Sequence, residues 1–166
     1  EDAIKNKKIK KGGIIVEGTA GNTGIGLAIV AKAYGLSLRV VIPKTQSIEK
    51  KKTLEALGAE LIEVDAAPYS SPNNYVKQSK IIAEKLSKSN QNGVLWANQF
   101  DNTVNADAHI KTTSQEIWIQ TAGMIHGFVC SVGTGGTLAG VSIGLKERNK
   151  NIKIALSDPM GSSLYS

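Results

Sequence analysis

The stretch that decides the fold reads VEGTAGNTGIGLA and spans residues 16–28. It starts in a short apolar run, passes through glycine, threonine and asparagine, and continues into a helical pattern of apolar residues. Glycine lets a ligand approach the main chain, and the first turn of a helix presents N–H groups that have no partner within the helix. The stretch therefore predicts a strand, a tight turn and a helix whose N-terminus binds an anion.

Short runs rich in valine, isoleucine and leucine alternate with helical patterns along the rest of the chain. Such runs are apolar on both faces, which is typical of strands in a parallel sheet that helices cover on both sides. Tyr75 and Leu86 belong to one helical stripe, and residues 106–121 form another. The alternation predicts a doubly wound α/β fold in which ligands bind at the carboxyl ends of the strands. The apolar runs lie at 14–16, 38–42, 60–64, 94–97, 128–132 and 152–156.

Other local signals mark the ends of these elements. Gly58 and Gly123 follow helical stretches and predict helix stops. The polar stretch AAPYSSPNN, residues 66–74, predicts an exposed connection between a strand and a helix. The lysine-rich residues 1–11 predict a short surface helix that leads into the first strand.

The composition describes an ordinary globular chain of 166 residues, 41% hydrophobic and 20% charged. No apolar run reaches the length of about 18 residues that a membrane span needs. Cys130, the only cysteine, excludes an internal disulfide and favours a reducing compartment, so we expect a cytoplasmic or mitochondrial protein. The net charge of +6 lies on helical faces without interleaved aromatic residues, which does not indicate nucleic-acid binding. His109 and His126 have no ligand pair at metal spacing, so no metal site is predicted.

A second glycine loop, SVGTGGTLAG at residues 131–140, also follows an apolar run and precedes a helical pattern. Its glycines leave room for a phosphate to touch consecutive N–H groups, and its threonines add hydroxyl donors. The dinucleotide fingerprint fails because Leu138 stands where it requires glycine, although Asp158 follows the next strand where a ribose partner is expected. No Gly-Lys-Ser/Thr follows the glycines, so the loop does not match a nucleoside-triphosphate loop. For either loop alone, a purely structural turn stays open.

Three motifs in this order are recognisable together: EGTAGNTGIGLA at 17–28, NQFDN at 98–102 and GTGGTLAG at 133–140. They resemble the cysteine synthase and cystathionine β-synthase family, whose members are pyridoxal-phosphate enzymes of fold type II, similar to the tryptophan synthase β subunit. The resemblance runs along essentially the whole chain. It is nearest to fungal cysteine-synthase-like proteins. The DPMGS at 158–162 resembles a DPxGS pattern found in those proteins and in the cystathionine β-synthase branch.

The resemblance implies two sets of site residues and one cofactor, pyridoxal 5′-phosphate. The first loop would grip the carboxylate of an amino-acid substrate, and Gln99 would be a second contact to it. Many relatives carry serine where this chain has Ala20, so one hydroxyl donor is lost. The expected substrate-binding residues are Thr19, Gly21, Asn22, Thr23 and Gln99. The expected cofactor-binding residues are Gly133, Thr134, Gly135, Gly136 and Thr137 at the phosphate, with Asn22 near the ring oxygen.

The resemblance also implies a reaction. In the family an α-proton is removed, a leaving group departs from the β-carbon, and a thiol or sulfide adds in its place. We expect a pyridoxal-phosphate-dependent enzyme of cysteine biosynthesis, a cysteine synthase that converts O-acetylserine and sulfide to cysteine and acetate. Two alternatives stay open: condensation of serine with homocysteine, as in cystathionine β-synthase, and a non-catalytic homologue that binds an amino acid or a partner.

Parts of the family's site are expected outside this chain. The Schiff-base lysine would lie upstream of residue 1, and the group that meets the pyridine nitrogen would lie beyond residue 166. We therefore expect a fragment that contains no catalytic residue and is inactive alone. By analogy, residues 1–108 form part of a smaller domain with the carboxylate loop, and residues 109–166 form part of a larger phosphate-binding domain. The full-length protein is expected to be a homodimer that acts on a small molecule.

Overall fold

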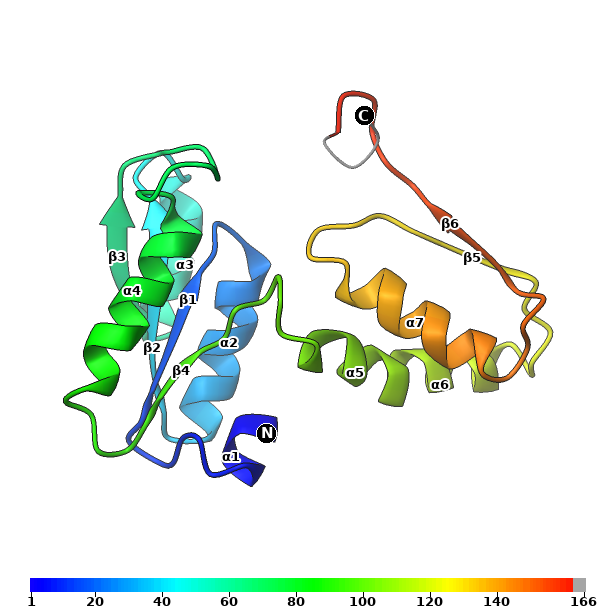
Figure 1. The fold of residues 1–166 in the computed structure, drawn as a ribbon, viewed down its shortest axis with the longest axis horizontal. Helices are drawn as coiled ribbons and strands as arrows, with labels where there is room; N and C mark the ends of the chain where they lie inside the picture. The colour runs from blue at the N-terminus through cyan, green and yellow to red at the C-terminus, as the bar shows by residue number, and fades with distance from the viewer. Residues whose placement is uncertain (163–166) are drawn as a thin grey trace. The chain divides into compact units, whose positions relative to one another are not determined.

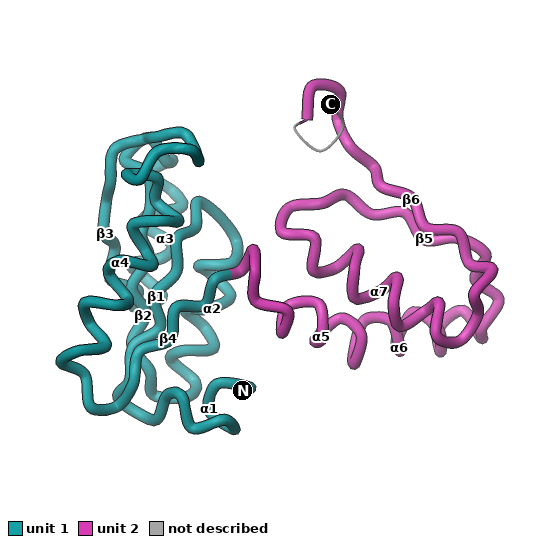
Figure 2. Tube along the Cα trace, in the orientation of Figure 1, with its two compact units in different colours: residues 1–98 teal, residues 99–166 magenta. Residues whose placement is uncertain are grey.

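The computed structural model describes residues 1–162 (Figure 1). The chain divides into two compact units, unit 1 from Glu1 to Asn98 and unit 2 from Gln99 onward (Figure 2). The sequence indicates a division after residue 108 instead. The difference arises because α5 (Val104–Lys111) packs along α7 (Gly136–Lys146), so the segment before residue 108 belongs with unit 2.

Unit 1 is built on a four-stranded parallel sheet whose strand order is β3-β2-β1-β4 (Figure 1). The glycine-rich stretch at 16–28 forms the turn between the central strand β1 and the helix α2, as its sequence predicts. The strands are β1 (Ile14–Gly18), β2 (Ser37–Pro43), β3 (Glu60–Val64) and β4 (Val94–Trp96). The helices are α1 (Asp2–Lys5), α2 (Asn22–Ala33), α3 (Ile48–Ala56) and α4 (Tyr75–Ser87).

Helices cover both faces of this sheet, which explains why its strands are continuously apolar. Successive side chains of a strand point to opposite faces. Ile15 of β1 and Val40 of β2 pack with residues of α2 and α3, whereas their neighbours Val16 and Val41 pack with α4 on the other face. Each such side chain contributes about 1.5–3 kcal/mol when it is fully buried. The doubly wound arrangement predicted from the sequence is therefore confirmed for unit 1.

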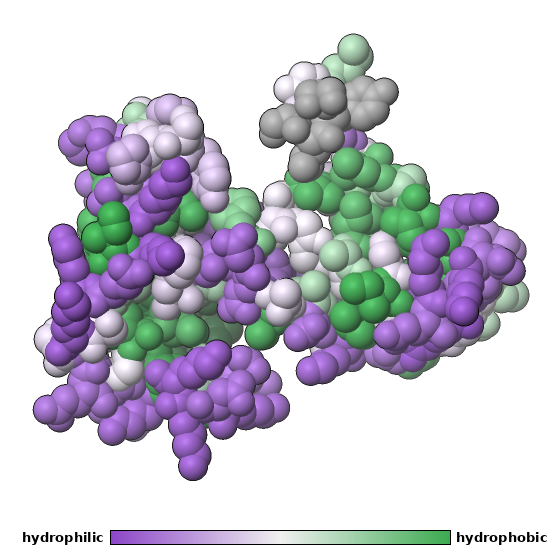
Figure 3. Space-filling view, viewed as in Figure 1, coloured by the Kyte–Doolittle hydropathy of each residue, from purple (hydrophilic) through white to green (hydrophobic). Residues whose placement is uncertain are grey.

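Unit 2 contains two parallel strands, β5 (Gly127–Cys130) and β6 (Lys153–Leu156), and α7 packs on one face of them. Val141 and Leu145 of α7 form a small core with Phe128. On the outer face Val129 is 65% exposed. Figure 3 shows hydrophobic residues at the surface of this unit.

The helical stretch predicted at 106–121 is in fact two helices, α5 and α6 (Thr113–Gln120). The break lies at Thr112, whose φ of −120° and ψ of −75° are not helical. Its hydroxyl donates to Ala108 O at 2.9 Å, and its branched side chain is crowded in a helix. One continuous helix was therefore a wrong prediction, and the local competition from Thr112 explains the interruption.

The remaining local predictions agree with the structure. Strands form at all six predicted apolar runs, with ends that differ by at most two residues. Gly58 and Gly123 follow α3 and α6 with φ of 90° and 73°. Residues 66–74 connect β3 to α4, where the side chain of Asn74 caps α4 by accepting from Val76 N at 3.0 Å. Within residues 1–162, no helix is both long and apolar enough to cross a membrane.

Candidate functional site

The first glycine loop joins the carboxyl end of β1 to the N-terminus of α2. Thr19 is buried, its N–H donates to Val41 O at 3.1 Å, and its Oγ1 accepts from Gly21 N at 3.2 Å. Gly21 is the N-cap residue of α2, and no side chain caps the helix there. A Cβ added at Gly21 would meet nothing within 4 Å. The loop therefore presents the first turn of α2 without covering it.

The polar side chains in the first turn of α2 are neutral. Asn22 and Thr23 are the first residues of α2, and the first turn of this helix contains no acidic residue. Amide, hydroxyl and main-chain N–H groups at a helix N-terminus stabilise an anion without adding a competing acid or base. This arrangement fits the carboxylate-binding role expected of Thr19, Gly21, Asn22 and Thr23, and that role stays a prediction.

The second glycine loop joins the carboxyl end of β5 to α7 in unit 2. Gly135 is the N-cap residue of α7 with φ of 86°, a left-handed conformation that glycine adopts without strain. No side chain caps α7, and its first turn contains no acidic residue. A Cβ added at Gly133 or Gly135 would meet nothing within 4 Å. The loop thus combines open glycine backbone with the N–H groups of an uncapped helix.

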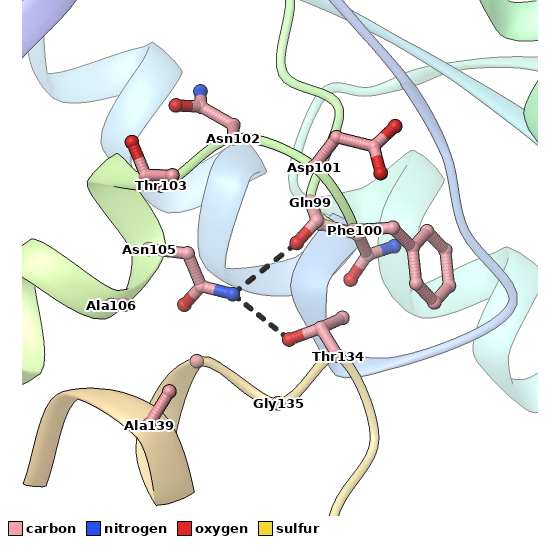
Figure 4. A pocket seen from close by; sticks show the side chains of 11 residues that line it. Gln99, Phe100, Asp101, Asn102, Thr103, Asn105, Ala106, Thr134, Gly135 and Ala139 are labelled. Atoms are coloured by element: carbon pink, nitrogen blue, oxygen red, sulfur yellow. Dashed lines mark hydrogen bonds between the residues drawn. The ribbon is translucent and has the colours of Figure 1, made fainter. Parts of the chain in front are cut away.

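Two side chains of α5 hold the threonines of this loop. Asn105 Nδ2 donates to Thr134 Oγ1 at 2.9 Å (Figure 4). His109 Nε2 lies 3.1 Å from Thr137 Oγ1, and His109 Nδ1 lies 2.9 Å from Thr113 Oγ1. Sequence reasoning assigned no role to Asn105 and treated His109 as an ordinary helical residue. The usable signal is their spacing of four residues, which places both on one helical face.

A cavity of about 210 Å³ lies beside the second loop, entirely within unit 2 (Figure 4). It brings together Gln99, Thr134, Gly135 and Gly136 of the predicted site residues. Its volume is below the roughly 300–1,000 Å³ of pockets for drug-sized ligands, so it suits a small group. Its other lining residues are Phe100, Asp101, Asn102, Thr103, Asn105, Ala106 and Ala139.

The predicted site residues are thus distributed over both units. Thr19, Gly21, Asn22 and Thr23 lie in unit 1, whereas Gln99 and the second loop lie in unit 2. Each set occupies the carboxyl end of a parallel strand, where ligands bind in α/β sheets. The expectation that both loops line one pocket stays a prediction.

The structure also shows the contacts or burial of three other residues that were considered from the sequence. The Sγ of Cys130 donates to Ser131 O at 3.0 Å, and Trp96 Nε1 donates to Ser79 Oγ at 3.0 Å. Asp158 follows β6, and one of its carboxylate oxygens is shielded from solvent. Among the described residues, no group of three or more His, Cys, Asp or Glu side chains is placed to hold a metal ion.

The second loop also passes a physical test for a bound phosphate ester. Such a group carries at least one full negative charge and needs several donors that do not repel it. The open backbone at Gly133 and Gly135, the uncapped N-terminus of α7 and the hydroxyls of Thr134 and Thr137 are donors of this kind. A helix N-terminus alone stabilises an anion by about 0.3–1 kcal/mol.

Parallel α/β units with glycine loops at the carboxyl ends of two strands are typical of proteins that bind small anionic ligands. The family model for the pyridoxal-phosphate dependent enzymes matches residues 1–166. The chain belongs to this family, and its fold is that of the fold type II pyridoxal-phosphate enzymes. The family found by resemblance in the sequence is therefore confirmed, together with the cofactor that the family uses.

The similarity extends to particular relatives. The chain is 47% identical to cysteine synthase 1 of Emericella nidulans, and the match covers 100% of this chain and 44% of the relative. It is 41% identical to the O-acetylserine dependent cystathionine beta-synthase of Bacillus subtilis, over 98% of this chain and 51% of that protein. A hydrogen sulfide-producing enzyme from Fusobacterium nucleatum superposes with a TM-score of 0.84 at 36% identity, over 99% and 53% of the two chains. The chain thus spans about half the length of these relatives.

Proposed function

We propose that the full-length protein is a cysteine synthase that converts O-acetylserine and sulfide to cysteine and acetate. The observation that carries this proposal is the second loop, whose open glycines and two hydrogen-bonded threonines suit the phosphate of the family's cofactor. The fungal cysteine synthase at 47% identity supports the choice of reaction. In the net reaction the Cβ–O bond breaks, acetate leaves with the bonding electrons, and sulfide forms the new Cβ–S bond.

The residues of this chain have binding and orienting roles in the proposal. Gly133, Thr134, Gly135, Gly136 and Thr137 would hold the cofactor's phosphate through main-chain N–H and hydroxyl groups. Pyridoxal phosphate, when bound, supplies an electron sink that makes the α-proton of an amino acid acidic. A phosphate gripped at several points fixes the position of the attached ring, which is the orienting contribution that a protein makes to such chemistry.

The first loop would hold the substrate. Thr19, Gly21, Asn22 and Thr23, with Gln99, would bind its carboxylate through neutral donors, and Asn22 would also lie near the cofactor's ring oxygen. Neutral donors suit this task because a charged acid or base there would compete for the proton that is transferred.

Steady-state turnover of the full-length protein separates the candidate reactions. We expect cysteine to form from O-acetylserine and sulfide faster than cystathionine forms from serine and homocysteine. The opposite preference would favour the cystathionine β-synthase alternative, which the Bacillus relative supports. Absence of both activities in a protein that binds the cofactor would favour the non-catalytic homologue.

The cofactor site is tested separately by ligand binding to the full-length protein. Thr137→Val keeps the shape of the side chain and removes its hydroxyl, so it should weaken binding of the phosphorylated vitamin. If the phosphate ester bound equally well to the unsubstituted protein and to Thr137→Val, the phosphate would not contact Thr137. We expect this chain alone not to catalyse the reaction, and turnover by it would contradict the predicted position of the lysine.

Assembly and location are further parts of the proposal. We propose a homodimer for the full-length protein, to be measured by light scattering during size-exclusion chromatography. A cytoplasmic or mitochondrial location follows from the reducing compartment that the single cysteine favours. A fluorescent fusion of the full-length protein would show which of the two applies, and secretion would contradict both.

A further inference from the structure

The side chain of Asn105 connects the main chain at Gln99 with the second glycine loop (Figure 4). Its Nδ2 donates to Gln99 O at 3.3 Å and to Thr134 Oγ1 at 2.9 Å. A carbonyl oxygen only accepts hydrogen bonds, so the nitrogen of the amide, and not its oxygen, must face Gln99. The two N–H bonds of this nitrogen therefore serve one acceptor each.

Packing restricts Asn105 as well. Gly136 is the first residue of α7, and a Cβ added there would lie closer than 3.0 Å to the amide atoms of Asn105. The amide thus occupies the space that a side chain at position 136 would need. Its position is set by the helix against which it packs as well as by its two hydrogen bonds.

The direction of the bond to Thr134 has a chemical consequence. A threonine hydroxyl has one proton to donate and two lone pairs that accept. Because Asn105 donates to Thr134 Oγ1, it occupies a lone pair and leaves the hydroxyl proton available for an acceptor in the cavity. An anion is an acceptor of this kind.

We propose that Asn105 is a positioning residue for cofactor binding, which acts through Thr134 without touching the cofactor. It orients the Thr134 hydroxyl as a donor to the cofactor's phosphate and ties this donor to the main chain at Gln99. The proposal rests on the phosphate-binding role proposed for the second loop. A purely structural role for Asn105 would affect folding of unit 2 but not the affinity for phosphate in the folded protein.

The probe is pyridoxine 5′-phosphate, whose alcohol cannot condense with surface lysines, and pyridoxine is the control without phosphate. Binding to the full-length protein freed of its cofactor is measured by titration calorimetry and by the ³¹P resonance of the ligand. We expect Thr134→Val to weaken binding of the phosphate ester about tenfold or more, as for the loss of a hydrogen bond to a charged group. Asn105→Ala should weaken it about fivefold, and binding of pyridoxine should not change in either variant.

A double-mutant cycle tests whether the two residues act together. In a Thr134→Val background, Asn105→Ala should have almost no further effect, because the hydroxyl that it orients is gone. Additive losses would overturn the proposal, since Asn105 would then act independently of Thr134. If Thr134→Val weakened binding and Asn105→Ala did not, the positioning role of Asn105 would be overturned. The phosphate-binding role of the second loop would then still stand. Failure of the unsubstituted full-length protein to bind the ester would overturn both proposals.

Asn105→Asp keeps the shape of the side chain and provides a test that survives if Asn105→Ala does not fold. An ionised carboxylate only accepts, so it would draw the Thr134 proton away from the phosphate and add a repelling charge. We expect a tenfold or greater loss of affinity at pH 8, where an aspartate carboxyl is ionised. Affinity equal to that of the unsubstituted protein would contradict the proposal.

Discussion

Substituting Gly140 by alanine tests the close approach of α5 and α7. Gly140 lies in the interior of α7, and a Cβ added there would lie 2.7 Å from His109 Cβ and closer still to Ala106 O, whereas ordinary contact begins near 3.4 Å. Alanine gains about 1 kcal/mol over glycine in helix propensity. Overpacking costs about 1–3 kcal/mol, and the upper part of this range applies because a main-chain carbonyl cannot rotate away. We therefore expect Gly140→Ala to lower the free energy of unfolding of unit 2 by roughly 1–2 kcal/mol.

Gly26 provides a matched control in α2. A Cβ added at this position would meet nothing within 4 Å, so Gly26→Ala gains helix propensity without a clash. We expect it to stabilise unit 1 by about 1 kcal/mol. The two substitutions are chemically identical and should differ in sign.

The tryptophans make this measurement specific to each unit. The chain has two, Trp96 on β4 in unit 1 and Trp118 on α6 in unit 2. Urea unfolding followed by fluorescence reports on unit 2 in a Trp96→Phe background and on unit 1 in a Trp118→Phe background. If Gly140→Ala raises the urea midpoint of unit 2 as Gly26→Ala raises that of unit 1, the inferred contact between α5 and α7 is wrong.

Three further predictions concern single side chains. Ala20→Ser should restore a hydroxyl donor at the first loop. We expect the KM of the full-length protein for O-acetylserine to fall about tenfold or more. An unchanged KM would count against a contact between this loop and the substrate carboxylate. His109→Leu should lower the free energy of unfolding of unit 2 by about 1 kcal/mol for each lost hydrogen bond. It should also weaken binding of the phosphate ester, because Thr137 loses its partner. Unchanged melting and unchanged binding would refute both effects. Lys44 donates a side-chain hydrogen bond to Asp65 at 2.8 Å, which raises the pKa of Lys44 above its ordinary value of 10.5. The small contribution of this pair to the stability of the fold is therefore present below pH 10.5. It is lost as the pH rises through the pKa of Lys44 in the folded state. Lys44→Met should therefore lower the urea midpoint slightly at pH 7 and not at strongly alkaline pH, and a pH-independent difference would contradict this.

The strands were predictable because their signal is local. In unit 1 a strand covered on both sides must be apolar at consecutive positions, as Ile15 and Val16 are, and this pattern needs no knowledge of partners. Gly58 and Gly123 were predictable for the same reason, because a helix stop depends on the backbone conformation of one residue. The interruption at Thr112 was missed because a hydroxyl that bonds the preceding turn leaves no mark in the apolar periodicity.

The candidate site was only partly predictable. The glycines and threonines of both loops are conspicuous because a binding loop needs bare backbone and small donors in one short stretch. Asn105 and His109 carry no such mark, since their roles arise only when α5 lies beside α7. The division of the chain after Asn98 depends on the same packing, which no local pattern contains.

The outer face of β5 and β6 has a thermodynamic consequence. Two strands with a covering helix on one side are marginal as a free-standing sheet, and here the other side exposes Val129. A strand or apolar surface that packs on this face binds only the folded form of unit 2. By mass action, the apparent stability of unit 2 then rises with the concentration of that partner. For this half of the chain, folding and association would then be linked equilibria.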